Sequence, residues 1–149
     1  MVQKAYKFRL YPNKEQQEYF SKVFGCVRFI YNRMLADKIA YYEETGKSLS
    51  NTPAQYKEEF PFLKEVDSLA LSNAQLNLQS AFRNFFRDKS VGFPKFKNKK
   101  SGYHSYTTNN QKGSVSIAGK YIKLPKIGYV RLEQHRFFEG TIKSVTISK

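Results

Sequence analysis

The stretch YKFRLYPNKEQ, residues 6–16, contains the point at which one type of secondary structure ends and another begins. Apolar and basic side chains alternate along its first part, which predicts a half-buried strand over Val2–Tyr11. Pro12 ends that strand, because proline has no amide hydrogen to donate. Asn13 is a favourable helix N-cap, and Gln16, three residues later, completes a capping box. The sequence therefore predicts a strand that leads directly into a helix.

Apolar residues recur at spacings of three and four after this cap, which predicts a helix with one buried face. That face consists of Phe20, Val23, Phe24, Val27, Ile30, Tyr31, Met34 and Leu35. It belongs either to one helix or to two helices broken near Gly25, and Gly46 is a favourable residue for the C-terminal end. A short helical unit is predicted over Pro53–Phe60, where Pro61 interrupts it, and a third helix is predicted over residues 67–89.

The helical pattern stops after Ser90. Short alternating segments at residues 103–108, 114–117, 121–124, 128–132 and 142–148 predict five strands separated by turns. We expect the first strand of the chain to pair with these later strands, which gives an α+β fold with a small antiparallel barrel. The expected parts are the first barrel strand (1–11), a helical lobe (12–90), a basic linker (91–102) and the remainder of the barrel (103–149).

The positive charge of the chain is concentrated in its C-terminal part. The 149 residues include 26 Lys or Arg and 12 Asp or Glu, for a formal net charge of +14. Residues 1–82 hold 11 basic and 9 acidic residues (net +2), whereas residues 83–149 hold 15 and 3 (net +12). This asymmetry predicts a polyanionic partner, either nucleic-acid phosphate or anionic lipid. Lipid is the weaker interpretation, because the apolar runs are far shorter than the roughly 20 residues that span a bilayer.

Other functional classes have little support in the sequence. The N-terminal residues lack the apolar centre of a signal peptide, so a cytoplasmic protein is expected. Cys26 is the single cysteine, which excludes an internal disulfide and a cysteine-rich zinc site. His104 and His135 do not have the spacing of metal ligands. The sequence therefore predicts no metal and no cofactor.

The segment GFPKFKNKK, Gly92–Lys100, is basic and contains no acid. Its candidate phosphate-binding residues are Lys95, Lys97, Lys99 and Lys100. In an extended backbone the first three would lie in a row on one face, which suits a phosphate backbone. Phe96 would face the other way and anchor the segment, while Phe93 would either pack or stack on a base. A flexible linker is the alternative interpretation.

Two neighbouring segments supply aromatic groups and neutral groups that can read base edges. The polar face of the third helix carries amides and arginines, and a polar segment follows the lysines. The candidate residues are Asn73, Gln75, Gln79, Arg83 and Arg87 on the helix, and Tyr103, Tyr106, Thr107, Thr108, Asn109, Asn110 and Gln111 in the second segment. A solvated helix face and a simple hairpin turn are the alternative interpretations.

Six motifs occur in the order and spacing of one known family. They are YKFRLYPNKEQ (6–16), GCVRFIYNRML (25–35), LSNAQLNLQSAFRNFF (71–86), GFPKFKNKK (92–100), YTTNNQ (106–111) and IKLPKIGYVRL (122–132). In this respect the chain resembles the TnpB family over essentially all of its length. TnpB proteins are the OrfB proteins of insertion sequences, long called transposases and now understood as RNA-guided DNA endonucleases related to type V CRISPR effectors.

The resemblance implies an OB-like, wedge-type barrel with a helical recognition lobe inserted into it. In TnpB proteins the N-terminal half, which this chain resembles, holds the scaffold of a guide RNA and reads a transposon-adjacent DNA motif. By position, Asn73, Gln75, Gln79 and the YTTNNQ segment would lie near that motif. Arg28, Tyr31, Asn32 and the lysines would contact the RNA or DNA backbone. DNA and a structured guide RNA are therefore the expected partners.

The sequence also departs from the family pattern. TnpB proteins continue into a RuvC-like nuclease domain with three metal-binding carboxylates, whereas this sequence ends at Lys149. We therefore expect it to bind nucleic acid without cutting it, because a two-metal site needs clustered carboxylates. If the barrel lacks its last strands, an unpaired edge would allow a homodimer.

Two alternative functions follow from the same residues. The chain could be a truncated copy that regulates or competes with a full-length transposase. It could also be a small metal-independent ribonuclease that uses His104 or His135.

Overall fold

The computed structural model describes residues 3–134 and 137–149, and its fold is α+β, as predicted. The helices are α1 (Lys14–Thr45) and α2 (Ser68–Arg87), and the short 3-10 helices are η1 (Pro53–Tyr56), η2 (Pro61–Glu65), η3 (Lys89–Val91) and η4 (Lys99–Ser101). The strands are β1 (Arg9–Tyr11), β2 (Ser105–Asn109), β3 (Ser116–Ala118), β4 (Tyr121–Leu124), β5 (Gly128–Glu133) and β6 (Ser144–Ser148).

Helix α1 is one continuous helix with well-formed ends. The Asn13 side chain accepts a hydrogen bond from the Gln16 amide at 2.9 Å, and the Gln16 side chain accepts one from the Asn13 amide at 2.9 Å. This is the predicted capping box. The helix runs through Gly25 without a break and ends at Gly46, which has a left-handed φ of 70°. The amide of Gly46 donates to the Tyr42 carbonyl at 2.8 Å.

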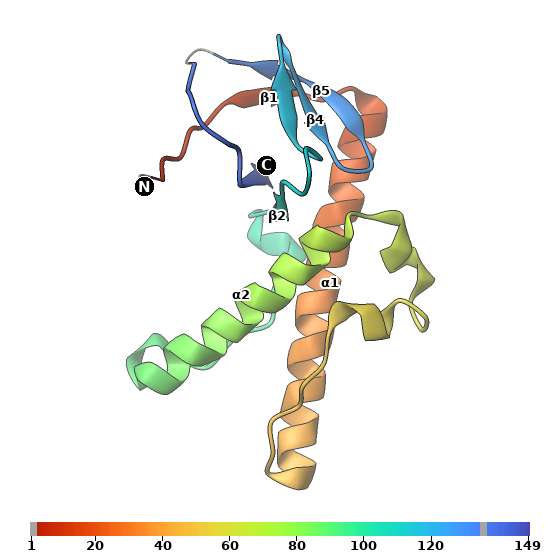
Figure 1. The fold of residues 1–149 in the computed structure, drawn as a ribbon. Helices are drawn as coiled ribbons and strands as arrows, with labels where there is room; N and C mark the ends of the chain where they lie inside the picture. The colour runs from red at the N-terminus through yellow and green to blue at the C-terminus, as the bar shows by residue number, and fades with distance from the viewer. Residues whose placement is uncertain (1–2, 135–136) are drawn as a thin grey trace.

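Helix α2 packs across α1, and the core of the helical region lies between them. Asp67 caps α2 by accepting a hydrogen bond from the Leu69 amide at 3.0 Å. Buried residues from α1, η2 and α2 include Ile30, Met34, Leu35, Leu63, Leu71 and Leu78. The fully buried positions of α2 end at Leu78, and Figure 1 shows the distal part of this helix extending away from α1.

The short helix predicted over Pro53–Phe60 is only the 3-10 helix η1. Pro61 disfavours helical backbone angles at the preceding residue, and Phe60 has φ −124° and ψ 79°. The chain therefore turns at Phe60 and starts η2.

The strands form two antiparallel sheets. The larger sheet has the order β1-β5-β4-β3, and β2 pairs with β6 in the smaller one. The expected pairing of the first strand with a later strand is thus present, although β1 is limited to the three residues that pair with Arg131–Glu133. Over the described residues the strand pairings do not close into the OB-like barrel that we expected. The predicted positions of the later strands are correct to within one or two residues at each end.

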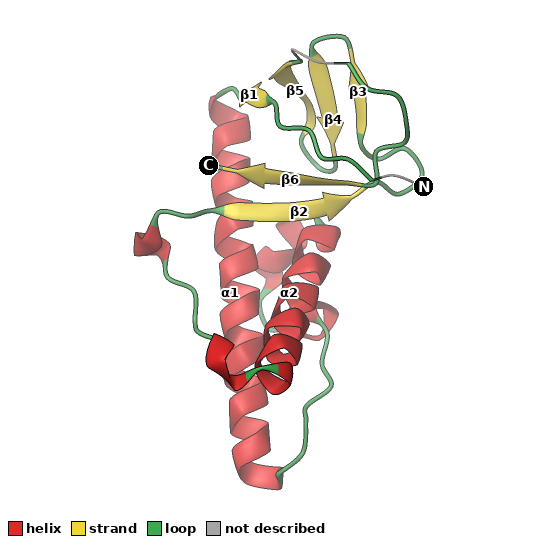
Figure 2. Ribbon diagram, turned by 90° about the vertical axis from the view of Figure 1, so that its left-hand side faces the viewer, coloured by secondary structure: helices red, strands yellow, loops and turns green. Residues whose placement is uncertain are grey.

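The β2–β6 pair connects the two parts of the molecule. Figure 2 shows it lying between the helices and the four-stranded sheet. One face of β2 packs on α1, since the ring of Tyr106 lies 5.8 Å from that of Phe24 and 6.2 Å from that of Phe20. Within the described ranges, no helix has both the length and the apolar character needed to cross a membrane.

Candidate nucleic-acid interface

The basic segment, Gly92–Lys100, is attached to α1 through Asn32. The Asn32 side-chain amide donates to the Lys97 carbonyl at 2.9 Å, and its oxygen accepts from the Lys97 amide at 2.7 Å. The Lys97 ammonium lies 4.6 Å from the centre of the Tyr31 ring, a cation–π contact. Asn32 and Tyr31, which we predicted to contact nucleic acid, thus hold the segment in place.

All four lysines of this segment are exposed. The ion pairs among the described residues, Lys22–Glu65 and Arg33–Asp37, leave these four without a carboxylate partner. The predicted row is shorter than expected, because Asn98 caps η4 by accepting from the Lys100 amide at 2.7 Å. Lys95 and Lys97 therefore precede η4, while Lys99 and Lys100 lie in it.

Three of the predicted contact residues are buried. Tyr31 is 7% exposed, Tyr106 is 4% exposed and Thr108 is 0% exposed. Burial raises the pKa of both tyrosines, so their hydroxyl groups stay protonated. The Thr108 hydroxyl donates to the carboxylate of Asp67, which is itself buried. These three side chains pack the fold and are not accessible to a ligand in this conformation.

The amides of α2 do not form one continuous face. The Asn73 amide nitrogen lies 3.0 Å from the Thr107 carbonyl and 2.7 Å from the Asn109 side-chain oxygen, so Asn73 joins α2 to β2. Gln75 instead donates to the Asn51 carbonyl at 3.1 Å. The structure therefore brings Asn73 together with the YTTNNQ segment but directs Gln75 to the loop before η1.

The remaining polar residues of the YTTNNQ segment have different partners: Thr107 bonds to β6, Asn110 bonds to the chain on either side of the turn, and Gln111 faces solvent. Thr107 shares a 2.8 Å hydrogen bond with Thr146 of β6. Asn110 donates to the Ile142 carbonyl at 2.9 Å and accepts from the Val115 amide at 3.1 Å. Gln111 is exposed.

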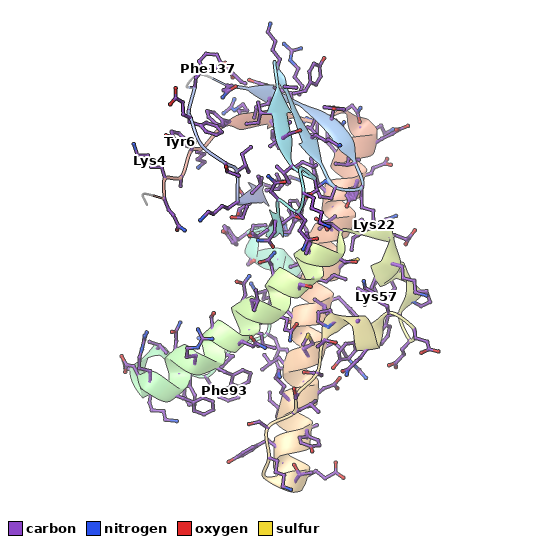
Figure 3. The ribbon with its side chains drawn as sticks, viewed as in Figure 1. Lys4, Tyr6, Lys22, Lys57, Phe93 and Phe137 are labelled. Carbon is purple, nitrogen blue, oxygen red and sulfur yellow. The ribbon has the colours of Figure 1, made fainter. Side chains whose placement is uncertain are left out.

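The distal part of α2 presents arginines and aromatic rings. Gln79, Arg83 and Arg87 are exposed along it. The ring of Phe93 lies edge-on to the rings of Phe82 and Phe85, at 5.5 and 5.4 Å, and Figure 3 shows it at this end of the helix. Phe93 thus packs on α2, although 46% of it remains exposed.

Sequence reasoning missed a hollow of about 270 Å³ beside the basic segment. Its walls come from α1, from the basic segment with the following turn, and from the chain entering β2. The lining residues are Phe24, Val27, Arg28, Phe96, Lys97, Asn98, Ser101, Tyr103, His104 and Ser105. Arg28 also lies on a shallow, open surface of α1. The sequence does show aromatic side chains close to Lys97, at Phe96 and Tyr103, but only folding brings them next to Phe24 of α1.

Comparison with known proteins identifies the family. A model described as the helix-turn-helix domain of IS605-type OrfB proteins matches residues 1–47. A Streptomyces pristinaespiralis protein named "Putative RNA-guided DNA endonuclease" is 40% identical over 106 residues, which are 66% of this chain and 26% of that protein. An Escherichia coli K12 protein with the same name and the suffix InsQ is 31% identical over 152 aligned positions, 97% of this chain and 37% of that protein. Virulence protein VsdF of Salmonella dublin is 36% identical over 113 residues, 64% of this chain and 93% of that protein.

The chain belongs to the TnpB (OrfB) family. It spans 26% and 37% of the lengths of the two TnpB relatives named as endonucleases, so it corresponds to one part of such proteins. The matched residues 1–47 contain β1 and α1, with α1 continuous from Lys14 to Thr45. In this TnpB chain the region described as helix-turn-helix therefore holds one long helix, and the docking geometry of a helix-turn-helix motif cannot be transferred to it.

Among residues 3–134 and 137–149, no group of three His, Cys, Asp or Glu could hold a metal ion. The His104 ring stacks on Phe24, with ring centres 5.9 Å apart. His135 lies outside the described residues.

Proposed function

We propose that this chain is a nucleic-acid-binding portion of a TnpB-like transposase, and that it binds the guide RNA and the transposon-adjacent DNA motif. The observation that carries the proposal is the Asn32 clamp. Two hydrogen bonds fix the backbone of a segment whose lysines are exposed and have no carboxylate partner. Fixing the segment before binding reduces the conformational entropy that is given up when it meets a phosphate backbone.

The proposed division of labour follows from exposure. Lys95, Lys97, Lys99 and Lys100 contact phosphates, and Arg28, a half-buried residue, adds a guanidinium beside them. Candidates for reading DNA bases are exposed polar residues on the distal part of α2 and directly after β2. They are Gln79, Arg83, Arg87 and Gln111. Asn73 would act indirectly, by positioning β2 against α2.

We also propose the domain boundaries given by the sequence. Residues 12–90 form the recognition lobe, residues 91–102 form the basic linker, and residues 1–11 and 103–149 supply the strands. A homodimer through an unpaired strand edge remains a prediction. The edge strands of the larger sheet, β1 and β3, each have three residues, and such short edges are poor templates for pairing with a second chain.

In this proposal the chain contributes binding and not DNA cleavage, and the nuclease chemistry belongs to other parts of TnpB proteins. A separate role as a regulator or competitor of a full-length transposase uses the same surface. The ribonuclease hypothesis has less support, since the His104 ring is stacked on Phe24. Binding to DNA and RNA would place the chain in the cytoplasm.

The test is a triple substitution of the segment, Lys95→Gln, Lys97→Gln and Lys99→Gln. Binding to a labelled duplex and to an RNA hairpin is measured by fluorescence anisotropy between 50 and 300 mM NaCl. The variant should bind more weakly, and its slope of log K against log salt should be shallower by about 0.9 for each duplex phosphate that it no longer neutralises.

A charge-matched control separates this site from general attraction. Lys14, Lys47 and Lys64 are also exposed, and replacing all three with Gln removes the same charge elsewhere. The control should retain most of the slope. If both triple variants lose affinity equally, or if the segment variant keeps the original slope, the lysines of the basic segment do not bind the phosphates.

A further inference from the structure

The hollow beside the basic segment has aromatic walls that the fold leaves exposed. Tyr103 is 71% exposed and Phe96 is 55% exposed. The inner wall is formed by the rings of Phe24 and His104, which are stacked with an interplanar angle of 25°. Large aromatic rings are usually removed from water on folding, so a site that keeps them exposed suits a flat ligand.

The polar groups of the hollow also point to one kind of ligand. Arg28 and Lys97 supply two positive charges, while Asn98, Ser101 and Ser105 supply neutral hydrogen-bonding groups. The Lys97 side chain is held over Tyr31, and its backbone is fixed by Asn32. A nucleotide matches the aromatic walls, the neutral hydrogen-bonding groups and the two cations. Its flat base can stack on the walls and form hydrogen bonds at its edges, and its phosphate can bind the cations.

The hollow has room for one flat base. Its volume of about 270 Å³ lies below the roughly 300–1,000 Å³ of pockets that enclose drug-sized molecules. A base within a duplex cannot enter such a hollow, because it is stacked on its neighbours and must leave the helix first.

We propose that this hollow binds the base of a single unpaired nucleotide, while the adjacent phosphates lie on Lys95 and Lys97. This inference rests on the proposed function, and it adds a preference for unpaired over paired nucleic acid. The base belongs either to single-stranded DNA or to an RNA with a bulged nucleotide, because both present an unpaired base next to a phosphate.

The experiment compares matched pairs of ligands. Anisotropy is measured with a DNA duplex and the same duplex carrying one bulged base, and with an RNA hairpin with and without a bulge. In at least one of the two pairs, DNA or RNA, the bulged ligand should bind about tenfold more tightly than its paired counterpart, as expected for stacking of one base. The ratio should stay constant between 50 and 200 mM NaCl, because stacking releases few counterions.

Variants locate the effect. Tyr103→Ala and Phe96→Ala should remove most of the preference for the bulge, so that bulged and paired ligands bind nearly equally, whereas Tyr103→Trp should preserve the preference. Phe137→Ala is the control, because Phe137 is 88% exposed and Figure 3 places it at the sheet end of the molecule. Circular dichroism confirms that each variant is folded.

The outcomes separate the two proposals. If the unaltered chain binds no oligonucleotide in 50 mM NaCl, the proposed function fails. If it binds duplex without any preference for the bulge, or if Tyr103→Ala and Phe96→Ala behave as Phe137→Ala does, the base pocket alone is wrong. Equal reductions in affinity for paired and bulged ligands would also contradict the pocket, because they would assign the two rings to general binding.

Discussion

Thr107 and Thr108 are neighbours on β2, but their hydroxyl groups have opposite surroundings. Thr108 faces the helices, is 0% exposed and donates to the buried carboxylate of Asp67. The other oxygen of that carboxylate caps α2 by accepting from the Leu69 amide. Thr107 lies on the opposite face of the strand and shares a hydrogen bond with Thr146. One hydroxyl therefore joins a strand to a helix cap in the core, and the other lies near solvent.

We predict that Thr108→Val destabilises the chain by about 1–3 kcal/mol, because it leaves a buried carboxylate oxygen without its donor while keeping the shape of the side chain. Thr107→Val makes the same chemical change outside the core and should cost less than about 0.5 kcal/mol. Urea unfolding followed by circular dichroism measures both free energies. Equal values for the two variants would mean that the Asp67 hydrogen bond does not stabilise the fold.

The same residues show what the sequence can predict at single positions. Alternation along YTTNNQ correctly indicates that neighbouring side chains face opposite ways, but it does not tell which face is buried. Asn32 is a second case. Its two hydrogen bonds join residues 65 positions apart in the chain, and no local pattern reveals such a partner.

Helix α1 contains a glycine inside it and another at its end, and the two have different backbone angles. Gly25 is helical, and a Cβ placed there would have only the end of the Arg28 side chain within 4 Å, at 3.8 Å. Gly46 has a φ of 70°, in the left-handed region that other residues rarely adopt. The same substitution should therefore have opposite effects at the two positions.

We predict that Gly25→Ala raises the free energy of unfolding by about 0.5–1 kcal/mol, since alanine loses less backbone entropy in a helix. Gly46→Ala should lower it by about 1 kcal/mol, because the C-terminal end of α1 needs a positive φ. Thermal and urea unfolding of the two variants show whether each substitution raises or lowers the free energy of unfolding. A destabilised Gly25→Ala variant would indicate that α1 requires flexibility at this position.

Element ends that depend on local chemistry are the ones the sequence predicts well. The Asn13–Gln16 capping box and Gly46 mark both ends of α1 correctly, because each cap is formed by residues within one helical turn. Sheet closure depends instead on pairing between distant strands. The alternation over Val2–Tyr11 predicts a longer strand than β1, because it cannot show that β5 pairs only with Arg9–Tyr11. The absence of a closed barrel in the described part of the chain has the same origin.

Across the whole molecule, positive charge greatly exceeds what ion pairs neutralise. The formal net charge is +14, and the described residues contain two ion pairs, both at the surface. Self-repulsion on this scale destabilises the compact state, whereas exposed ion pairs contribute little to it. Salt screens the repulsion within the folded chain and also weakens its attraction to nucleic acid. Stability and affinity should therefore respond to salt in opposite directions.

We predict that the melting temperature at pH 7 rises by about 2–4 °C between 50 and 300 mM NaCl, the shift expected for roughly 1 kcal/mol of relieved repulsion in a chain of this size. Chloride is the appropriate salt, because sulfate and phosphate strengthen apolar burial by themselves. The Lys95→Gln, Lys97→Gln, Lys99→Gln variant should start from a higher melting temperature at 50 mM NaCl and gain less from added salt, since it carries less charge. A melting temperature that falls with NaCl would show that attractive ion pairs outweigh repulsion. In that case the excess lysines would be compensated within the fold and less available to a polyanion.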